Sequence, residues 1–138
     1  MSKLELSLGD ALRLGSAVVP APHSMEIERC GIGMVYRAHG VSGILSRDCS
    51  TINLIYHGVV DKAWPCPWCE EDAGIQGGGV ASAAVIQHPF GEHYLTGEIS
   101  IEQLAEWLDF IGTDPGWRQI QDRIRAMREE AAQAEAVC

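Results

Sequence analysis

Four residues of the types that bind transition metals occur in the middle of the chain in the order C-x2-C-x18-H-x4-H. They are Cys66, Cys69, His88 and His93. A turn with two intervening residues lets both thiolates of a C-x2-C pair reach one ion at about 2.3 Å, and two imidazoles at about 2.0–2.1 Å complete a tetrahedral shell. We therefore expect a structural zinc ion, which would hold together two segments of the chain that are far apart in sequence.

Several alternatives to this ligand set stay open. Cys30, Cys49 or His57 could replace one of the four ligands, or the thiols could simply be buried as small apolar side chains. The cysteine number, five, is odd and the chain start lacks an export signal, so a disulfide framework is not expected. A redox-active C-x-x-C would need a thioredoxin-like βαβ pattern, which does not precede it. Because 89–91 reads Pro-Phe-Gly, we expect the two histidines to lie across a turn and not on one helix.

The net charge of −9 is concentrated in one part of the chain, because no Lys or Arg occurs between Lys62 and Arg118. This span holds Glu70, Glu71, Asp72, Glu92, Glu98, Glu102, Glu106, Asp109 and Asp114. Direct nucleic-acid binding is disfavoured, since it depends on Lys and Arg. The acids form either a solvated face or a surface for a protein with a basic patch. The candidate partner-binding residues are Glu70, Glu71, Asp72, Glu92 and the two tryptophans beside the cysteines, Trp64 and Trp68.

Hydrophobic periodicity and capping residues predict helices along most of the chain. The expected helices start after Ser7, after Ser24, at Val80 with an end at His88, after Ser100 with Gln103 as its capping-box partner, and after Asp114 with Pro115 in the first turn. Trp107 and Trp117 fall on the apolar faces of the last two helices, so we expect both in the core. Residues 51–60 fit a strand or a short buried helix.

These elements predict one compact domain over 1–138. We expect a mainly α fold, or α+β with a small sheet, containing about four to five helices, a zinc-knuckle-like loop and a frayed tail over 129–138. No stretch reaches the roughly 20 apolar residues of a membrane helix, so we expect a protein of the cytoplasm without membrane contact.

Signatures of catalysis are incomplete in this chain. The Pro-Cys-x-x-Cys sequence at 65–69 matches one half of the zinc deaminase signature, but neither His39 nor His57 is followed by the glutamate of the other half. No G-x-S-x-G elbow or phosphate-binding loop occurs. A non-catalytic protein is therefore the expectation.

The order of motifs resembles a group of small bacterial and phage proteins of uncharacterised activity. The resemblance implies a prokaryotic or phage cytoplasmic protein and no particular reaction. It rests on Ala11-Leu-Arg-Leu-Gly-Ser16, Cys30-Gly-Ile-Gly33, the Cys66-Pro-Trp-Cys69 turn, His88, His93 and Ile101-Glu-Gln-Leu-Ala-Glu-Trp-Leu108.

Together these features predict a small acidic accessory protein that is stabilised by zinc and binds another protein through residues 70–114. One alternative is a phage-type inhibitor that occupies a basic groove in a host nucleic-acid-handling defence complex, with a salt-sensitive affinity. A second is a zinc-dependent hydrolase with an open ligand position and Glu70, Glu71 or Glu92 as the base. A third is a homodimer formed through the C-terminal helix.

Overall fold

The computed structural model describes residues 6–20, 22–26, 29–41, 56, 64–69, 72–73, 75–76, 79–80 and 84–137. The helical elements of this part of the chain are α1 (Leu8–Val18), α2 (Gly31–Ala38), α4 (Ala84–Pro89), the π-helical turn η2 (Phe90–Tyr94), α5 (Ile101–Ile111) and α6 (Trp117–Val137). Its strands are β1 (Trp64–Pro65), β2 (Asp72–Ala73), β3 (Ile75–Gln76) and β4 (Gly79–Val80). The strands form two antiparallel pairs, β1 with β2 and β3 with β4. The expectation of a mainly helical domain is confirmed.

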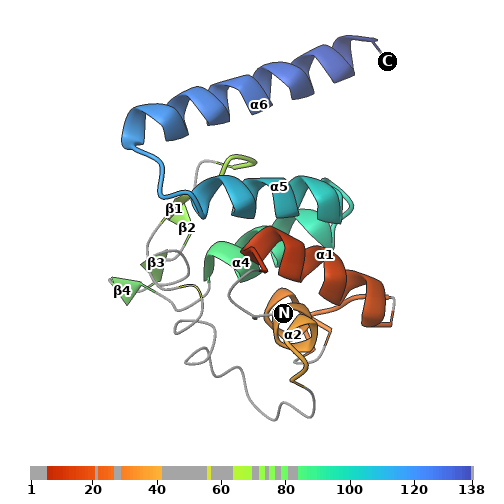
Figure 1. Ribbon diagram of the computed structural model, residues 1–138. Helices are drawn as coiled ribbons and strands as arrows, with labels where there is room; N and C mark the ends of the chain where they lie inside the picture. The colour runs from red at the N-terminus through yellow and green to blue at the C-terminus, as the bar shows by residue number, and fades with distance from the viewer. Residues whose placement is uncertain are drawn as a thin grey trace.

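Helix α1 lies between α2 and α5 in the body of the molecule (Figure 1). Two glycines let it approach both neighbours closely. A Cβ on Gly15 would collide with the main chain of Met34 in α2, and a Cβ on Gly9 would collide with Ala105 and Asp109 in α5. The helix backbones are therefore in direct contact, which leaves no space for a side chain at either glycine.

The apolar core is formed mainly by the facing sides of α1, α2, α4 and α5. Its largest fully buried side chains are those of Trp107, Phe90, Leu12, Met34, Ile86, Leu104, Leu108 and Ile111. The amphipathic spacing of Leu104, Trp107, Leu108 and Ile111 in the sequence thus corresponds to the face of α5 that is buried.

A charged network also joins α1 to α5. The guanidinium group of Arg13 contacts Asp10 at 2.7 Å, Glu102 at 2.8 Å and Asp109 at 2.8 Å. The hydrogen bond to Glu102 contributes most to raising the pKa of Arg13, and it lowers the pKa of Glu102 in return. Asp109 also accepts a hydrogen bond from the main-chain N–H of Gly9 at 2.9 Å. Two acids of the acidic span are therefore paired within the chain.

Several predicted helix ends are confirmed. Ser7 accepts a hydrogen bond from the N–H of Asp10 at the start of α1. Ser100 and Gln103 form the expected capping box of α5, and Gly112 caps the end of that helix. These signals succeed because capping depends on hydrogen bonds between residues only three or four positions apart.

Four expectations about helix position and burial are wrong. Val80, where a helix is expected to start, lies in strand β4, and the helix α4 is described from Ala84. Helix α2 begins at Gly31, with Cys30 as its N-cap. Helix α6 begins at Trp117, because Asp114 adopts a left-handed conformation with φ 55° and the side chain of Gln119 accepts from the N–H of Gly116. Trp117 is 62% exposed, whereas Trp107 is buried as expected. Trp117 is the first residue of α6, and the apolar stripe of this helix becomes buried only at Ile120.

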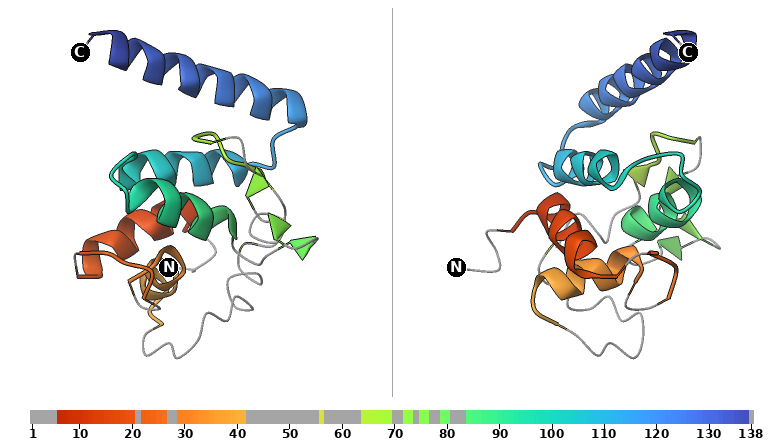
Figure 2. Two further views of the ribbon diagram at one scale, coloured as in Figure 1. Left: turned by 180° about the vertical axis from the view of Figure 1, so that it is seen from behind. Right: turned by 90° about the vertical axis from the view of Figure 1, so that its right-hand side faces the viewer.

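Helix α6 extends past the body of the molecule and carries the C-terminus away from it (Figure 2). Ile120 is buried, and Ile124 and Met127 pack against the core from partly exposed positions. The helix continues through Val137, so the fraying expected for 129–138 stays a prediction about dynamics.

No helix in the described ranges combines the length and the apolar character needed to cross a membrane. Within 51–60 only residue 56 is described, so the secondary structure expected there lies outside the described residues.

Candidate metal centre

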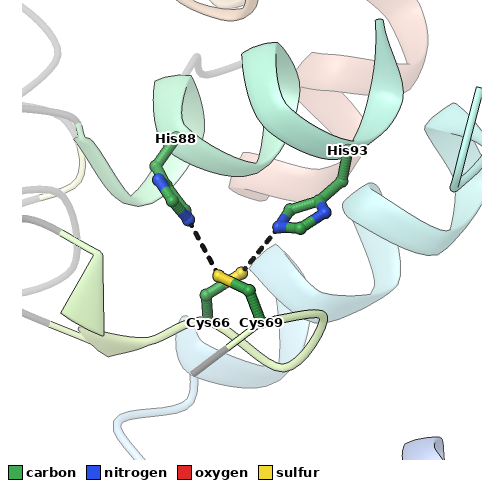
Figure 3. Close-up of side chains that lie close together, drawn as sticks. All are labelled: Cys66, Cys69, His88 and His93. Atoms are coloured by element: carbon green, nitrogen blue, oxygen red, sulfur yellow. Dashed lines mark hydrogen bonds between the residues drawn. The ribbon is translucent and has the colours of Figure 1, made fainter. Parts of the chain in front are cut away.

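The two cysteines of the cluster lie in the turn that follows β1. Prolines 65 and 67 restrict the backbone of this turn on either side of Cys66. The side chain of Cys66 is buried and that of Cys69 is partly exposed. Both sulfurs point to the same side of the turn, toward helix α4 and η2 (Figure 3). The C-x2-C spacing therefore brings the two thiols together, as the sequence predicts.

The two histidines come from one continuous helical segment, which corrects the expectation that Pro89 ends the helix and puts them across a turn. His88 lies in α4, Pro89 is the last residue of that helix, and His93 lies in η2. A π turn follows the proline directly, with the N–H of Leu95 donating to the carbonyl of Phe90 at 3.0 Å. A wide turn of this kind lets a helix continue where a proline has removed a donor.

The π turn also explains how residues five positions apart can face the same ion. In a regular α-helix such residues point about 140° apart, because each residue advances the helix by about 100°. The i to i+5 hydrogen-bond pattern of a π turn stacks residue i+5 close to residue i. Accordingly the rings of His88 and His93 lie together, with centroids 5.7 Å apart, and both project toward the cysteines (Figure 3).

The four donor atoms have the dimensions of a small tetrahedral site. One ligand atom from each of Cys66, Cys69, His88 and His93 can be chosen so that all lie within 4.8 Å of one another. The Sγ of Cys66 is 3.4 Å from the Nε2 of His93, and the Sγ of Cys69 is 3.3 Å from the Nε2 of His88. With the usual zinc–ligand bond lengths, the sulfur–nitrogen edge of a tetrahedron is about 3.6 Å. The cluster can therefore bind a metal ion with little rearrangement.

Glu98 holds the ring of His93 in place from the side opposite the cysteines. Its Oε1 atom accepts from the Nδ1 of His93 at 2.8 Å, which leaves Nε2 to face the cluster. The main chain brings Glu98 to this position by turning back at Gly97, where φ is 84°, and the N–H of Glu98 donates to the carbonyl of His93 at 2.9 Å. A carboxylate on the distant nitrogen of a ligating histidine fixes its tautomer and makes it a better ligand.

Two tryptophans lie near the cluster in different settings. Trp68, between the cysteines, is partly buried, with its ring 6.0 Å from that of His93 and 6.4 Å from that of Trp107. Trp64 in β1 is only 4% exposed and belongs to the core. Trp68 therefore packs beside the cluster. Trp64 is too buried to be presented to a partner, so we do not include it in a binding surface.

Before a metal ion binds, burial favours the neutral form of the Cys66 thiol. Removal of the sulfur from water raises the pKa of Cys66 to about 12, and the hydrogen bond that the neutral Cys66 thiol donates to the sulfur of Cys69 adds to this effect. The main-chain N–H of Trp68 acts in the opposite direction by donating to the sulfur. A divalent cation would reverse the preference, because a coordinating thiol loses its proton.

The remaining candidate residues are placed as follows. Glu92 is exposed on η2, and Cys30 is buried at the start of α2 and is not part of the cluster. Asp72 is in β2, where its backbone is described. Glu70, Glu71, Cys49 and His57 lie outside the described residues.

Two elements of this site are not predicted from the sequence. The charge pattern gives Glu98 only as one of the acids, although a carboxylate five residues after a candidate ligand, with a glycine just before it, is a signal for a supporting residue. The π turn has no comparable local signal, because Pro89 and Gly91 normally indicate the end of a helix.

Neither a family model, nor a curated protein, nor a solved structure matches this chain.

Proposed function

We propose that this chain is a non-catalytic interaction domain whose fold is stabilised by a structural zinc ion bound to Cys66, Cys69, His88 and His93. The observation that carries the proposal is the convergence of four donor atoms, from two separate segments, within 4.8 Å of one another. Two thiolates and two imidazoles in a tetrahedral arrangement favour zinc over the harder cations, which prefer oxygen ligands.

The composition of the shell supports a structural role for the ion. Four protein side chains complete a tetrahedron, whereas catalytic zinc sites keep one position for water or substrate. Cys66 and His93 are both buried, at 2% and 5% exposure, which limits the approach of a substrate from their side. A hydrolase is therefore the less well supported alternative.

The distribution of the acidic side chains supports a protein partner with a basic surface. Glu102 and Asp109 are neutralised by Arg13, so they contribute less to the external field than the sequence suggests. Glu92 and Glu106 are exposed and form no ion pair within the described residues. These two side chains are the described part of the proposed binding surface, which lies within the 70–114 span.

Metal analysis of protein purified without chelator tests the zinc site. We expect about one zinc ion per chain in the wild type, and loss of zinc together with a fall in melting temperature for Cys66→Ser and His93→Ala. His23→Ala is the matched control, because His23 is a partly buried histidine outside the cluster. Wild-type protein without zinc would overturn the proposal, and zinc loss without any loss of stability would overturn its structural role.

Binding to a poly-lysine peptide tests the acidic surface. The double variant E92Q/E106Q should bind the peptide more weakly than E129Q/E130Q, which removes the same charge from exposed positions on α6. Binding of the wild type should weaken steeply as salt rises. Equal losses for the two double variants would show that only net charge matters and would contradict a localised surface.

A further inference from the structure

Helix α6 lies against the turn that carries the two cysteines. The guanidinium group of Arg128 donates to the main-chain carbonyl of Cys69 at 3.2 Å. Grooves lie along α6, one with a volume of about 610 Å³ between Ile124 and the cysteines, and one of about 660 Å³ between Met127 and Trp68. Arg128 lines both grooves, so this residue marks the place where the helix crosses the turn.

The part of α6 that contacts the body is short compared with the length of the helix. Ile120 is the buried anchor, Ile124 and Met127 are partly exposed, and Arg123 lies over the ring of Phe110 with its charged carbon 5.5 Å from the ring centre. The open grooves show that the helix is not closely packed on the body around these contacts. Local opening requires least free energy where few apolar contacts are buried, so α6 is an element that can detach before the core unfolds.

The segment that precedes α6 is short and contains two glycines. Residues 112–116 read Gly-Thr-Asp-Pro-Gly, and Asp114 adopts a left-handed conformation. Figures 1 and 2 show that this short connection joins α6 to the end of α5 and that the helix then crosses above the turn.

We propose that metal binding to the four-residue cluster controls the docking of α6, so that the helix is held on the body when the ion is bound and is released when it is lost. This inference rests on the proposed zinc site. The ion would fix both ends of the turn, Cys66 and Cys69, and the Cys69 carbonyl and the ring of Trp68 belong to the same turn. Without the ion, the sulfur–nitrogen contacts and the ring contact of Trp68 with His93 hold the turn less firmly, and the partners of α6 lose their fixed positions.

Thermodynamic linkage makes the proposal reciprocal. If bound metal favours the docked helix and the helix is released in the metal-free chain, then a change that weakens docking also lowers the affinity for metal, by up to the same factor. A variant far from the ligating atoms can therefore report on the coupling. Arg128→Ala removes the hydrogen bond to the Cys69 carbonyl, and Arg118→Ala is the matched control, an exposed arginine on the same helix that lines neither groove.

Hydrogen exchange followed by mass spectrometry on the full chain tests the docking step. Zinc removal with a chelator should accelerate exchange in peptides covering 120–128 at least about tenfold, and should change peptides of α1 much less. In zinc-loaded protein, Arg128→Ala should accelerate exchange in 120–128 about fivefold, whereas Arg118→Ala should not. Exchange that rises equally in α1 and α6 on zinc removal would overturn the proposal, because the whole domain would then be opening.

Zinc affinity, measured by competition with a chromophoric chelator, tests the coupling. Arg128→Ala should weaken zinc binding, by up to the factor by which it accelerates α6 exchange, and Arg118→Ala should leave the affinity unchanged. Faster α6 exchange with unchanged zinc affinity would overturn only this inference. A chain that binds no zinc would overturn the proposed metal centre, and this inference with it.

Discussion

The hydrogen bond between Glu98 and His93 leads to a prediction about metal affinity. The Glu98→Gln substitution keeps the size of the side chain and an oxygen that can accept from Nδ1, and removes only the negative charge. The bond is short, at 2.8 Å, and the His93 side chain is 7% exposed, so the imidazole depends on this partner for its orientation and basicity. The substitution should therefore weaken zinc binding while it leaves the four ligands in place.

The structure also sets the size of the effect. Loss of a partner of this kind typically lowers metal affinity about 10–100-fold. The Glu98 side chain is 49% exposed, so water screens its charge, and the glutamine retains an acceptor. We therefore expect the lower end of the range, about tenfold, which corresponds to about 1.4 kcal/mol of binding free energy.

Chelator competition at a fixed pH measures the change, and the absorption spectrum of the cobalt-substituted protein reports whether the tetrahedral geometry is kept. Glu92→Gln is the control, since it removes the same charge from an exposed side chain one residue before His93. If both variants lose affinity equally, the effect is a general one of charge. If neither does, Glu98 has no part in positioning the ligand and the reasoning is refuted.

Three further predictions concern the stability of the fold. Gly15→Ala should lower the free energy of unfolding in urea by about 1–3 kcal/mol, because the new Cβ meets the backbone of Met34, and Gly116→Ala should change it by less than about 0.5 kcal/mol; equal effects would contradict the close helix contact. Arg13→Gln should cost about 1 kcal/mol, with a smaller loss in high salt because its carboxylate partners are partly exposed; a loss that does not depend on salt would argue against an electrostatic role. Burial raises the pKa of Tyr56 from 10.0 to about 12, so the contribution of its neutral hydroxyl to the free energy of unfolding is complete below pH 10 and is lost as pH rises toward 12. The stability of Tyr56→Phe should therefore decline less at alkaline pH than that of the wild type, and parallel declines would contradict this.

The local features of this protein were accessible from its sequence. The capping residues Ser7 and Ser100 and the buried face of α5 were predicted correctly, because they depend on hydrogen bonds and periodicity within one or two helical turns. The composition of the cluster was predicted for a related reason. Thiols and imidazoles are the side chains that can form a tetrahedral site of this kind, and the C-x2-C spacing brings the two sulfurs together without reference to the rest of the fold.

Interactions between distant segments could not be predicted in this way. Arg13 neutralises Glu102 and Asp109 across about ninety residues of chain, so the acidic surface is smaller than the charge pattern indicates. Trp117 lies on an apolar stripe and yet is 62% exposed, whereas Ile120 on the same stripe is buried.

The sequence by itself determined which side chains are available to bind a metal ion and where most helices lie. The tertiary structure alone decided that His88 and His93 share one helical segment, that Glu98 supports the second histidine and that α6 crosses the cysteine turn. The physical reason is that caps and spacings are satisfied within a few residues, whereas a π turn after a proline and a helix seated on a distant turn are stabilised by packing that no local pattern encodes.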